Sequence, residues 1–146
     1  MPDLIVESVG LHRLAEIYPL IRSATRVSLD RWKGFGEALL ADGGGVLAVI
    51  APDDCIHGVA TYRSIRNLRH EQSLQIEILV AFELIPHATV RRALCGAIER
   101  LARDRGCDTI VFTVDAQRHA DSLSAARLSW EELGLQMETV GFVQQL

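Results

Sequence analysis

The sequence predicts an α/β fold in which helices cover both faces of one mixed β-sheet. Residues 76–82 and 109–114 are short apolar runs rich in β-branched side chains, and residues 89–105 between them form an amphipathic helical pattern. A strand, a helix and a second strand in this order form a βαβ unit with parallel strands. Two more strand-like runs, 46–51 and 56–63, flank a proline-containing turn and predict an antiparallel hairpin. The sheet should therefore contain both kinds of pairing.

The helix of the βαβ unit is the clearest single element. Its apolar side chains recur at a spacing of three and four residues, and its charged side chains fall on the opposite face. Thr89 can cap its start and Gly106 can end it. The apolar face consists of Val90, Ala93, Leu94, Ala97, Ile98, Leu101 and Ala102.

The residues before the hairpin predict one strand and two helices. Residues 4–6 favour a strand, and residues 11–21 show a helical pattern that Pro19 should end or kink. A second helix is expected from about Ser28 to the glycines at 43–45. Its buried side would carry Trp32, Phe35, Leu39 and Leu40. For Trp32 and Phe35 we expect packing in the core, with lining of a substrate site as the alternative.

The residues after the βαβ unit predict a loop, a helix and a final strand. Residues 115–122 are polar and loop-like, residues 123–133 favour a helix closed by Gly134, and residues 139–143 favour a strand. The complete predicted order is β-α-α-β-β-β-α-β-α-β.

The composition restricts the class of protein. With 146 residues the chain fits a single domain over 1–146, and 49% hydrophobic with 23% charged residues is ordinary for a globular protein. No apolar run is long enough for a membrane span, and no leader precedes the first strand, so we expect a cytoplasmic protein. The net charge of −4 argues against general nucleic-acid binding.

Cysteine, histidine and arginine show few functional patterns. Three cysteines without CxxC spacing are expected to be small core residues, and the five histidines lack the spacing of metal ligands, so no metal site is expected. Arg63, Arg66, Arg69 and His70 lie close together in sequence. Such a cluster is typical of a solvated loop face; contact with a phosphate or an acidic ligand is the alternative.

Three segments together resemble the GCN5-related N-acetyltransferase (GNAT) superfamily. They are the I-E-x-L strand at 76–79, the helix RALCGAIERLARDRGC at 92–107 and the W-E-E-L-G-L segment at 130–135. The resemblance covers essentially the whole chain and implies a GNAT-like acyl-CoA N-acyltransferase fold. It also implies transfer of an acyl group from acyl-CoA, with acetyl-CoA as the expected co-substrate, to an amine.

The resemblance assigns a role to each part of the 76–82 strand. Glu77 matches the carboxylate that accepts the amine proton, directly or through water, which an ammonium must lose before it can attack. A partly buried carboxylate would suit this task, although a salt bridge to a neighbour is the alternative role for Glu77. Leu79, Val80 and Ala81 match the residues that pair with pantetheine. A backbone N–H near Leu79 would stabilise the oxyanion.

The turn that should bind the pyrophosphate departs from the family pattern. The aligned residues at 86–91 contain neither of the expected glycines. Amides at the helix start, together with Arg91, Arg92 or a protonated His87, offer a different set of anion donors. The predicted cofactor-binding residues are therefore Leu79, Val80, Ala81, His87, Thr89, Val90, Arg91 and Arg92.

A second departure concerns the proton donor to the leaving thiolate. Trp130 occupies the position of the family tyrosine, and an indole cannot act as an acid at neutral pH. Two functions follow from the resemblance: an N-acyltransferase acting on a primary amine, or a catalytically degenerate domain that binds a ligand or a protein. The expected partners are acyl-CoA and an amine, with neither nucleic acid nor membrane. Pairing of exposed sheet edges would make a homodimer.

Overall fold

A computed structural model describes residues 3–83 and 89–146 and contains a five-stranded sheet in the order β1-β2-β3-β4-β5. Neighbours from β1 to β4 pair antiparallel, whereas β4 and β5 pair parallel, which confirms the predicted mixed sheet and the βαβ unit. The strands are β1 Ile5–Val9, β2 Gly45–Ile50, β3 Ile56–Ile65, β4 Ser73–Ala81 and β5 Thr109–Phe112.

The chain divides into two compact units, Met1–Thr113 and Val114–Leu146, and each is described by itself. The first unit contains the whole sheet, a short 3-10 turn at Leu11–Arg13 and three helices; the second contains two short helices. A single domain over 1–146 stays a prediction. The helices are α1 Leu14–Ala24, α2 Leu29–Ala41, α3 Thr89–Asp104, α4 Ala116–His119 and α5 Ala125–Glu132.

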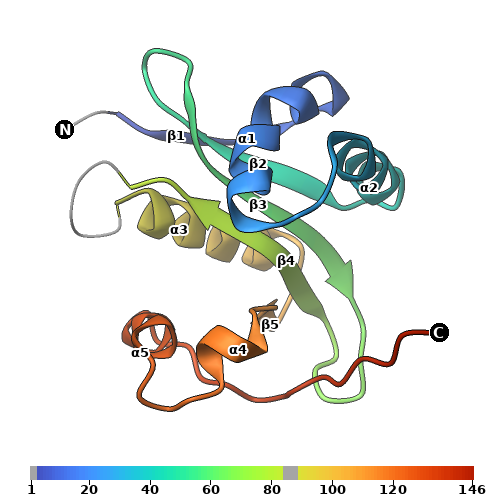
Figure 1. Cartoon of the computed structure of the whole chain (residues 1–146), viewed down its shortest axis with the longest axis vertical. Helices are drawn as coiled ribbons and strands as arrows, with labels where there is room; N and C mark the ends of the chain where they lie inside the picture. The colour runs from blue at the N-terminus through green and yellow to red at the C-terminus, as the bar shows by residue number, and fades with distance from the viewer. Residues whose placement is uncertain (1–2, 84–88) are drawn as a thin grey trace. The chain divides into compact units, whose positions relative to one another are not determined.

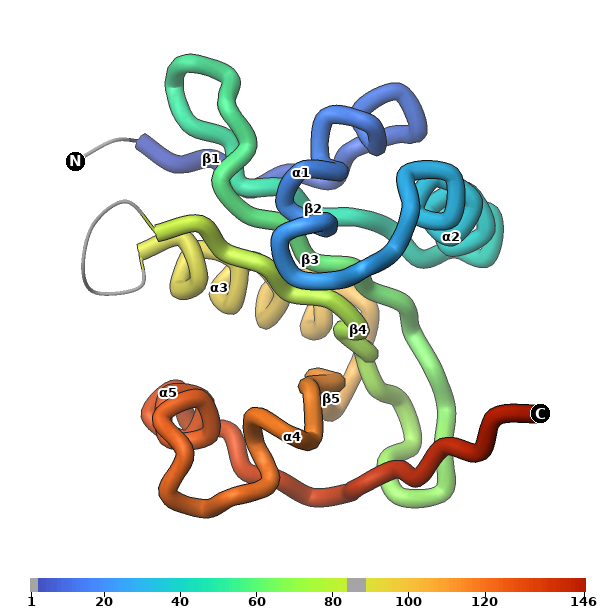
Figure 2. The backbone as a smooth tube through the Cα atoms, in the orientation of Figure 1, coloured from blue at the N-terminus to red at the C-terminus, as the bar shows by residue number. Residues whose placement is uncertain are grey.

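Helices α1 and α2 lie on one face of the sheet and α3 lies on the other (Figure 1). Strand β2 shows why both faces are needed, because all six of its residues are buried. Val46 and Ala48 face α1 and α2, while Leu47 and Val49 face α3. A strand that is apolar on both sides is stable only between two covering layers. Figure 2 traces how the chain places α1 and α2 before it enters the β2–β3 hairpin.

Helix α2 is anchored by Trp32, whose side chain is 1% exposed. The Trp32 indole Nε1 donates a hydrogen bond of 2.8 Å to the backbone oxygen of Leu14 in α1. Ser28 caps the start of α2, because its side chain accepts a hydrogen bond from the Arg31 amide. Trp32 is thus a core residue, as expected. Its packing and its hydrogen bond fix the position of α2 against α1 and the sheet.

Helix α3 confirms the most distinct sequence pattern. Its buried residues are Val90, Leu94, Ile98 and Ala102. Gly106 ends the helix with a φ of +71°, a backbone conformation that favours glycine, and the Cys107 amide bonds back to Ala102. The amphipathic face therefore packs on the sheet as expected.

Some expectations were wrong. Residues 139–143 form no strand, and Phe142 is 98% exposed, because β-branched and aromatic residues make a strand only where a neighbour completes its ladder. Helix α1 does not end at Pro19 but continues to Ala24, since burial of Ile17 and Ile21 offsets the lost hydrogen bond; a kink at Pro19 stays a prediction.

Two smaller differences concern single segments. Cys55 is exposed in the β2–β3 turn and is not a core residue, while Cys95 and Cys107 are half-buried. Residues 116–119, expected in a loop, form the short helix α4. Of the helices that the structure describes, none has the length and apolarity needed to cross a bilayer.

Candidate active site

A β-bulge in β4 positions Glu77. The register pairs Ala60 with Leu79 and Tyr62 with Ile76, so Thr61 lies opposite two residues of β4, Glu77 and Ile78. The Ile78 amide donates to Thr61 Oγ1 at 3.2 Å. Ile76 packs on the α3 side of the sheet, whereas Ile78 packs on the α1–α2 side. The bulge therefore turns Glu77 and Ile78 toward the same face, where α2 lies.

Beyond the bulge, β4 has an open edge. Its parallel pairing with β5 ends at Ile76 and Phe112, and the Thr113 amide donates to the Ile76 oxygen. The amides of Ile78 and Phe82 both point toward β3. Since successive amides of a strand point in opposite directions, those of Leu79 and Ala81 point away from β3. In the described part of the chain no strand pairs with that edge.

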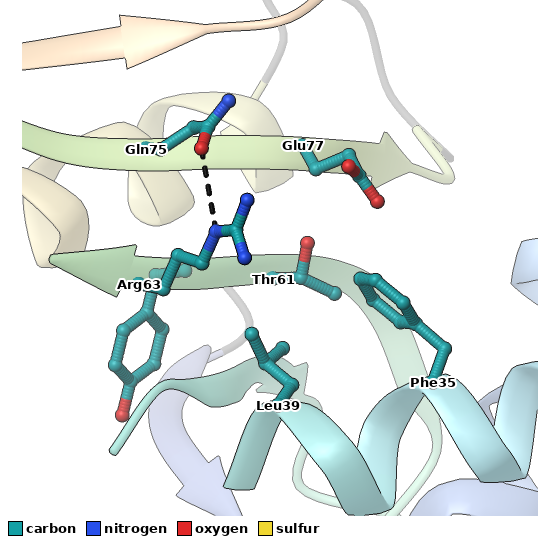
Figure 3. A pocket seen from close by; sticks show the side chains of 7 residues that line it. Phe35, Leu39, Thr61, Arg63, Gln75 and Glu77 are labelled. Atoms are coloured by element: carbon teal, nitrogen blue, oxygen red, sulfur yellow. Dashed lines mark hydrogen bonds between the residues drawn. The ribbon is translucent and has the colours of Figure 1, made fainter. Parts of the chain in front are cut away.

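Glu77 lines a pocket of about 160 Å³ between α2 and the two central strands (Figure 3). Its carboxylate is exposed, not partly buried as expected. Within the described residues it forms no salt bridge, so the alternative role as an ion-pair partner finds no support. The pocket is lined by Phe35, Leu39, Thr61, Tyr62, Arg63, Gln75 and Glu77.

The first amides of α3 bind a carboxylate of the chain itself. Glu83 Oε2 accepts from the Val90 amide at 3.1 Å and Glu83 Oε1 accepts from the Arg91 amide at 2.8 Å. These two amides belong to the helix start at which the sequence predicts an anion site, and that role stays a prediction. Thr89 is already the first helical residue, so the described cap is Glu83 and not Thr89. A fixed anion thus occupies the position at which the helix dipole favours negative charge.

The other predicted binding residues at this helix start differ in their exposure. The Val90 side chain is 5% exposed and packs in the core, so only its backbone faces the helix start. Arg91 is half-buried, and burial lowers the pKa of its guanidinium from the usual value. Arg92 is exposed at this first turn. His87 lies outside the described residues.

The remaining predicted residues lie at the end of β4. Leu79, Val80 and Ala81 are half-buried and pair with Ala60, Val59 and Gly58 of β3. The structure thus brings the expected pantetheine residues, the helix start and Glu77 onto one continuous segment. Their roles stay predictions.

Sequence reasoning missed Glu83 and the full pocket. Glu83 caps amides seven and eight residues further along the chain, a separation that no local capping pattern covers. The sequence suggested Arg63 only as a member of the arginine cluster. Because Arg63 lies two residues after Thr61 on the same strand, both side chains point to the same face of the sheet. Phe35 packs against the core, as expected, and also lines the pocket; its lining of a substrate site stays a prediction.

In the second unit, Trp130 is used as a hydrogen-bond donor to histidine. Its Nε1 donates to His119 Nε2 at 3.1 Å, and His119 Nδ1 lies 2.7 Å from the Asp115 oxygen. Because an indole only donates, Nε2 must accept, which leaves the proton of a neutral His119 on Nδ1. Trp130 therefore has a structural hydrogen bond where the family pattern has a tyrosine.

The fold of this chain matches that of solved GNAT acetyltransferases. No protein-family model matches the sequence, and no curated protein matches it. The fold is recognised from solved structures alone.

Three solved structures illustrate the range of proteins with this fold. Aminoglycoside N-acetyltransferase AAC(6')-Iy in complex with CoA is 16% identical, with a TM-score of 0.81 over 99% of this chain and 96% of that one. Ribosomal-protein-alanine N-acetyltransferase from Brucella melitensis biovar Abortus 2308 is 16% identical, with a TM-score of 0.72 over 99% of this chain and 100% of that one. Glucosamine-6-phosphate N-acetyltransferase from Arabidopsis thaliana is 8% identical, with a TM-score of 0.72 over 98% of both chains.

Proposed function

We propose that the protein transfers an acyl group from an acyl-CoA, with acetyl-CoA as the expected donor, to a primary amine. The observation that carries this proposal is the open edge of β4 after the bulge, which runs directly beside a pocket containing Glu77. An extended pantetheine can add to such an edge through backbone hydrogen bonds, as peptides add to exposed strands. The solved structure with CoA has the same fold, which supports an acyl-CoA as the co-substrate.

The residues allow a direct transfer. The amine nitrogen would attack the thioester carbonyl carbon while Glu77 takes up its proton, directly or through water. The outward-pointing amide of Leu79 would donate to the oxyanion of the tetrahedral intermediate. When that intermediate collapses, the carbon–sulfur bond breaks and CoA leaves as a thiolate. Water would protonate the thiolate, because Trp130 cannot.

Calorimetry with acetyl-CoA and with CoA tests the first step. We expect a dissociation constant in the micromolar range for both ligands. At a hundred times that constant, the ligand should raise the free energy of unfolding by about 2.7 kcal/mol. Absence of binding at millimolar ligand would contradict the enzyme proposal and support the second function, a domain that keeps the fold and binds another partner. The capping of α3 by Glu83 is the observation that favours this second function.

Glu83→Gln tests whether this carboxylate competes with the pyrophosphate. Loss of the charge-assisted cap should lower the free energy of unfolding by about 0.5–2 kcal/mol. The same change should tighten CoA binding roughly tenfold, since a pyrophosphate would no longer displace an anion. Both effects are measurable by urea unfolding and calorimetry.

Glu99→Gln is the matched control, because Glu99 lies on α3 away from the helix start that Glu83 caps, and it forms an ion pair with the exposed Arg103. It should leave CoA affinity unchanged. Unchanged or weaker CoA binding by Glu83→Gln would show that Glu83 caps the helix without opposing the ligand.

A further inference from the structure

The pocket beside β4 contains two opposite charges that are not paired with each other. Arg63 lies across from Gln75 in the β3–β4 register, and the bulge brings Glu77 to the same face (Figure 3). In the parts of the chain that the structure describes, neither Arg63 nor Glu77 forms a salt bridge. The pocket therefore offers one cationic and one anionic side chain to a ligand.

One hydrogen bond positions the Arg63 side chain and leaves part of its guanidinium for a ligand. Its Nε donates to Gln75 Oε1 at 3.4 Å, across the β3–β4 pair. The two terminal nitrogens of the guanidinium do not take part in this hydrogen bond. A guanidinium with its terminal nitrogens available matches the two oxygens of a carboxylate.

The walls of the pocket limit what it accepts. Phe35 and Leu39 of α2 form an apolar side, and Leu39 is 7% exposed. A volume of about 160 Å³ is below the roughly 300–1,000 Å³ of pockets for drug-sized ligands. The pocket therefore fits a small molecule.

We infer that the acyl acceptor is a small amino acid that binds as a zwitterion, with its amine at Glu77 and its carboxylate at Arg63. The inference rests on the proposed function. The charges of Arg63 and Glu77 cancel, so they complement a ligand with one charge of each sign. A polyamine would meet Arg63 as a like charge, and a phosphorylated amine would bring a second negative charge next to Glu77. The carboxylate is therefore favoured over either.

The test compares acceptors that differ only in the anionic group. Release of the CoA thiol is followed with acetyl-CoA and a panel of glycine, β-alanine and alanine, the amide of each, phosphoethanolamine and putrescine. In the wild-type protein we expect kcat/KM for at least one free amino acid to exceed that of its amide at least tenfold. Arg63→Gln should remove this preference by raising KM for the acid, while kcat changes little.

Arg66→Gln is the matched control, because Arg66 is a nearby exposed arginine that bonds to Gln72 and does not line the pocket. It should keep the preference for the acid, and Arg63→Lys should keep part of it. Equal rates for acid and amide, or a preference for putrescine or phosphoethanolamine, would overturn the inference while leaving acyl transfer established.

Binding without turnover separates the two proposals. If no amine releases thiol, the proposed function fails, and calorimetry with the same amino acids and amides then decides the inference alone. Binding of an amino acid that Arg63→Gln weakens at least tenfold would support the site as an amino-acid site. Absence of binding by every amino acid would reject it.

Discussion

Replacement of Glu77 by Gln should lower kcat by roughly 10²–10⁴-fold, the usual contribution of a general base. Gln has the same shape, but it cannot accept the proton that the ammonium must lose before the amine attacks. The measurement is the steady-state rate of CoA thiol release with the best acceptor of the amine panel. Because Glu77 is exposed and forms no salt bridge among the described residues, the free energy of unfolding should change by less than about 0.5 kcal/mol.

Two controls accompany this substitution. Glu37→Gln removes another exposed carboxylate, on α2 but outside the pocket lining, and should leave kcat unchanged. Affinity for acetyl-CoA should be the same in Glu77→Gln and in the wild-type protein, since the predicted cofactor contacts lie further along β4 and on α3. A wild-type kcat in Glu77→Gln would remove Glu77 from the mechanism.

Replacement of Trp32 by Ala should lower the free energy of unfolding by about 3–5 kcal/mol, the range for aromatic-to-alanine changes in a core. Trp32 is fully buried between α2, α1 and the sheet, and its loss would leave a cavity. It would also leave the buried Leu14 oxygen without its indole donor. Urea unfolding measures the change.

Trp32→Phe separates the two causes. Phenylalanine keeps much of the apolar contact but not the hydrogen bond, so about 1–3 kcal/mol should be lost. A loss from Trp32→Ala below 1 kcal/mol would show that α2 does not depend on this anchor. Because Phe35 and Leu39 lie on the same helix, both variants should also raise KM for the acceptor.

The sequence and the structure agree best where a segment forms most of its contacts locally. Helix α3 follows from its three-and-four spacing and from Gly106, because hydrogen bonds within a helix span four residues. The β2–β3 hairpin follows from two β-branched runs around a short turn. Helix α2 begins at Leu29, close to the start expected at about Ser28.

The sequence-based prediction failed where the structure of a segment depends on residues distant in the sequence. Residues 139–143 have the composition of a strand, but composition does not supply the neighbouring strand that a ladder requires. The capping of Val90 and Arg91 by Glu83 spans seven and eight residues, beyond any local capping motif. The missing strand and the Glu83 cap both depend on contacts between distant residues, which the spacing of apolar residues in the sequence does not predict.

For the candidate site, the sequence by itself determined that Glu77 and residues 79–81 belong to one strand that runs toward an amphipathic helix. Only the tertiary structure showed the bulge opposite Thr61, the open edge at Leu79 and the union of Arg63 with Glu77 in one pocket. The physical reason is that side-chain alternation is a local property, whereas register is set between strands. A one-residue shift of register exchanges the two faces of a strand. Which charges meet in the pocket was therefore decided by the pairing of β3 with β4.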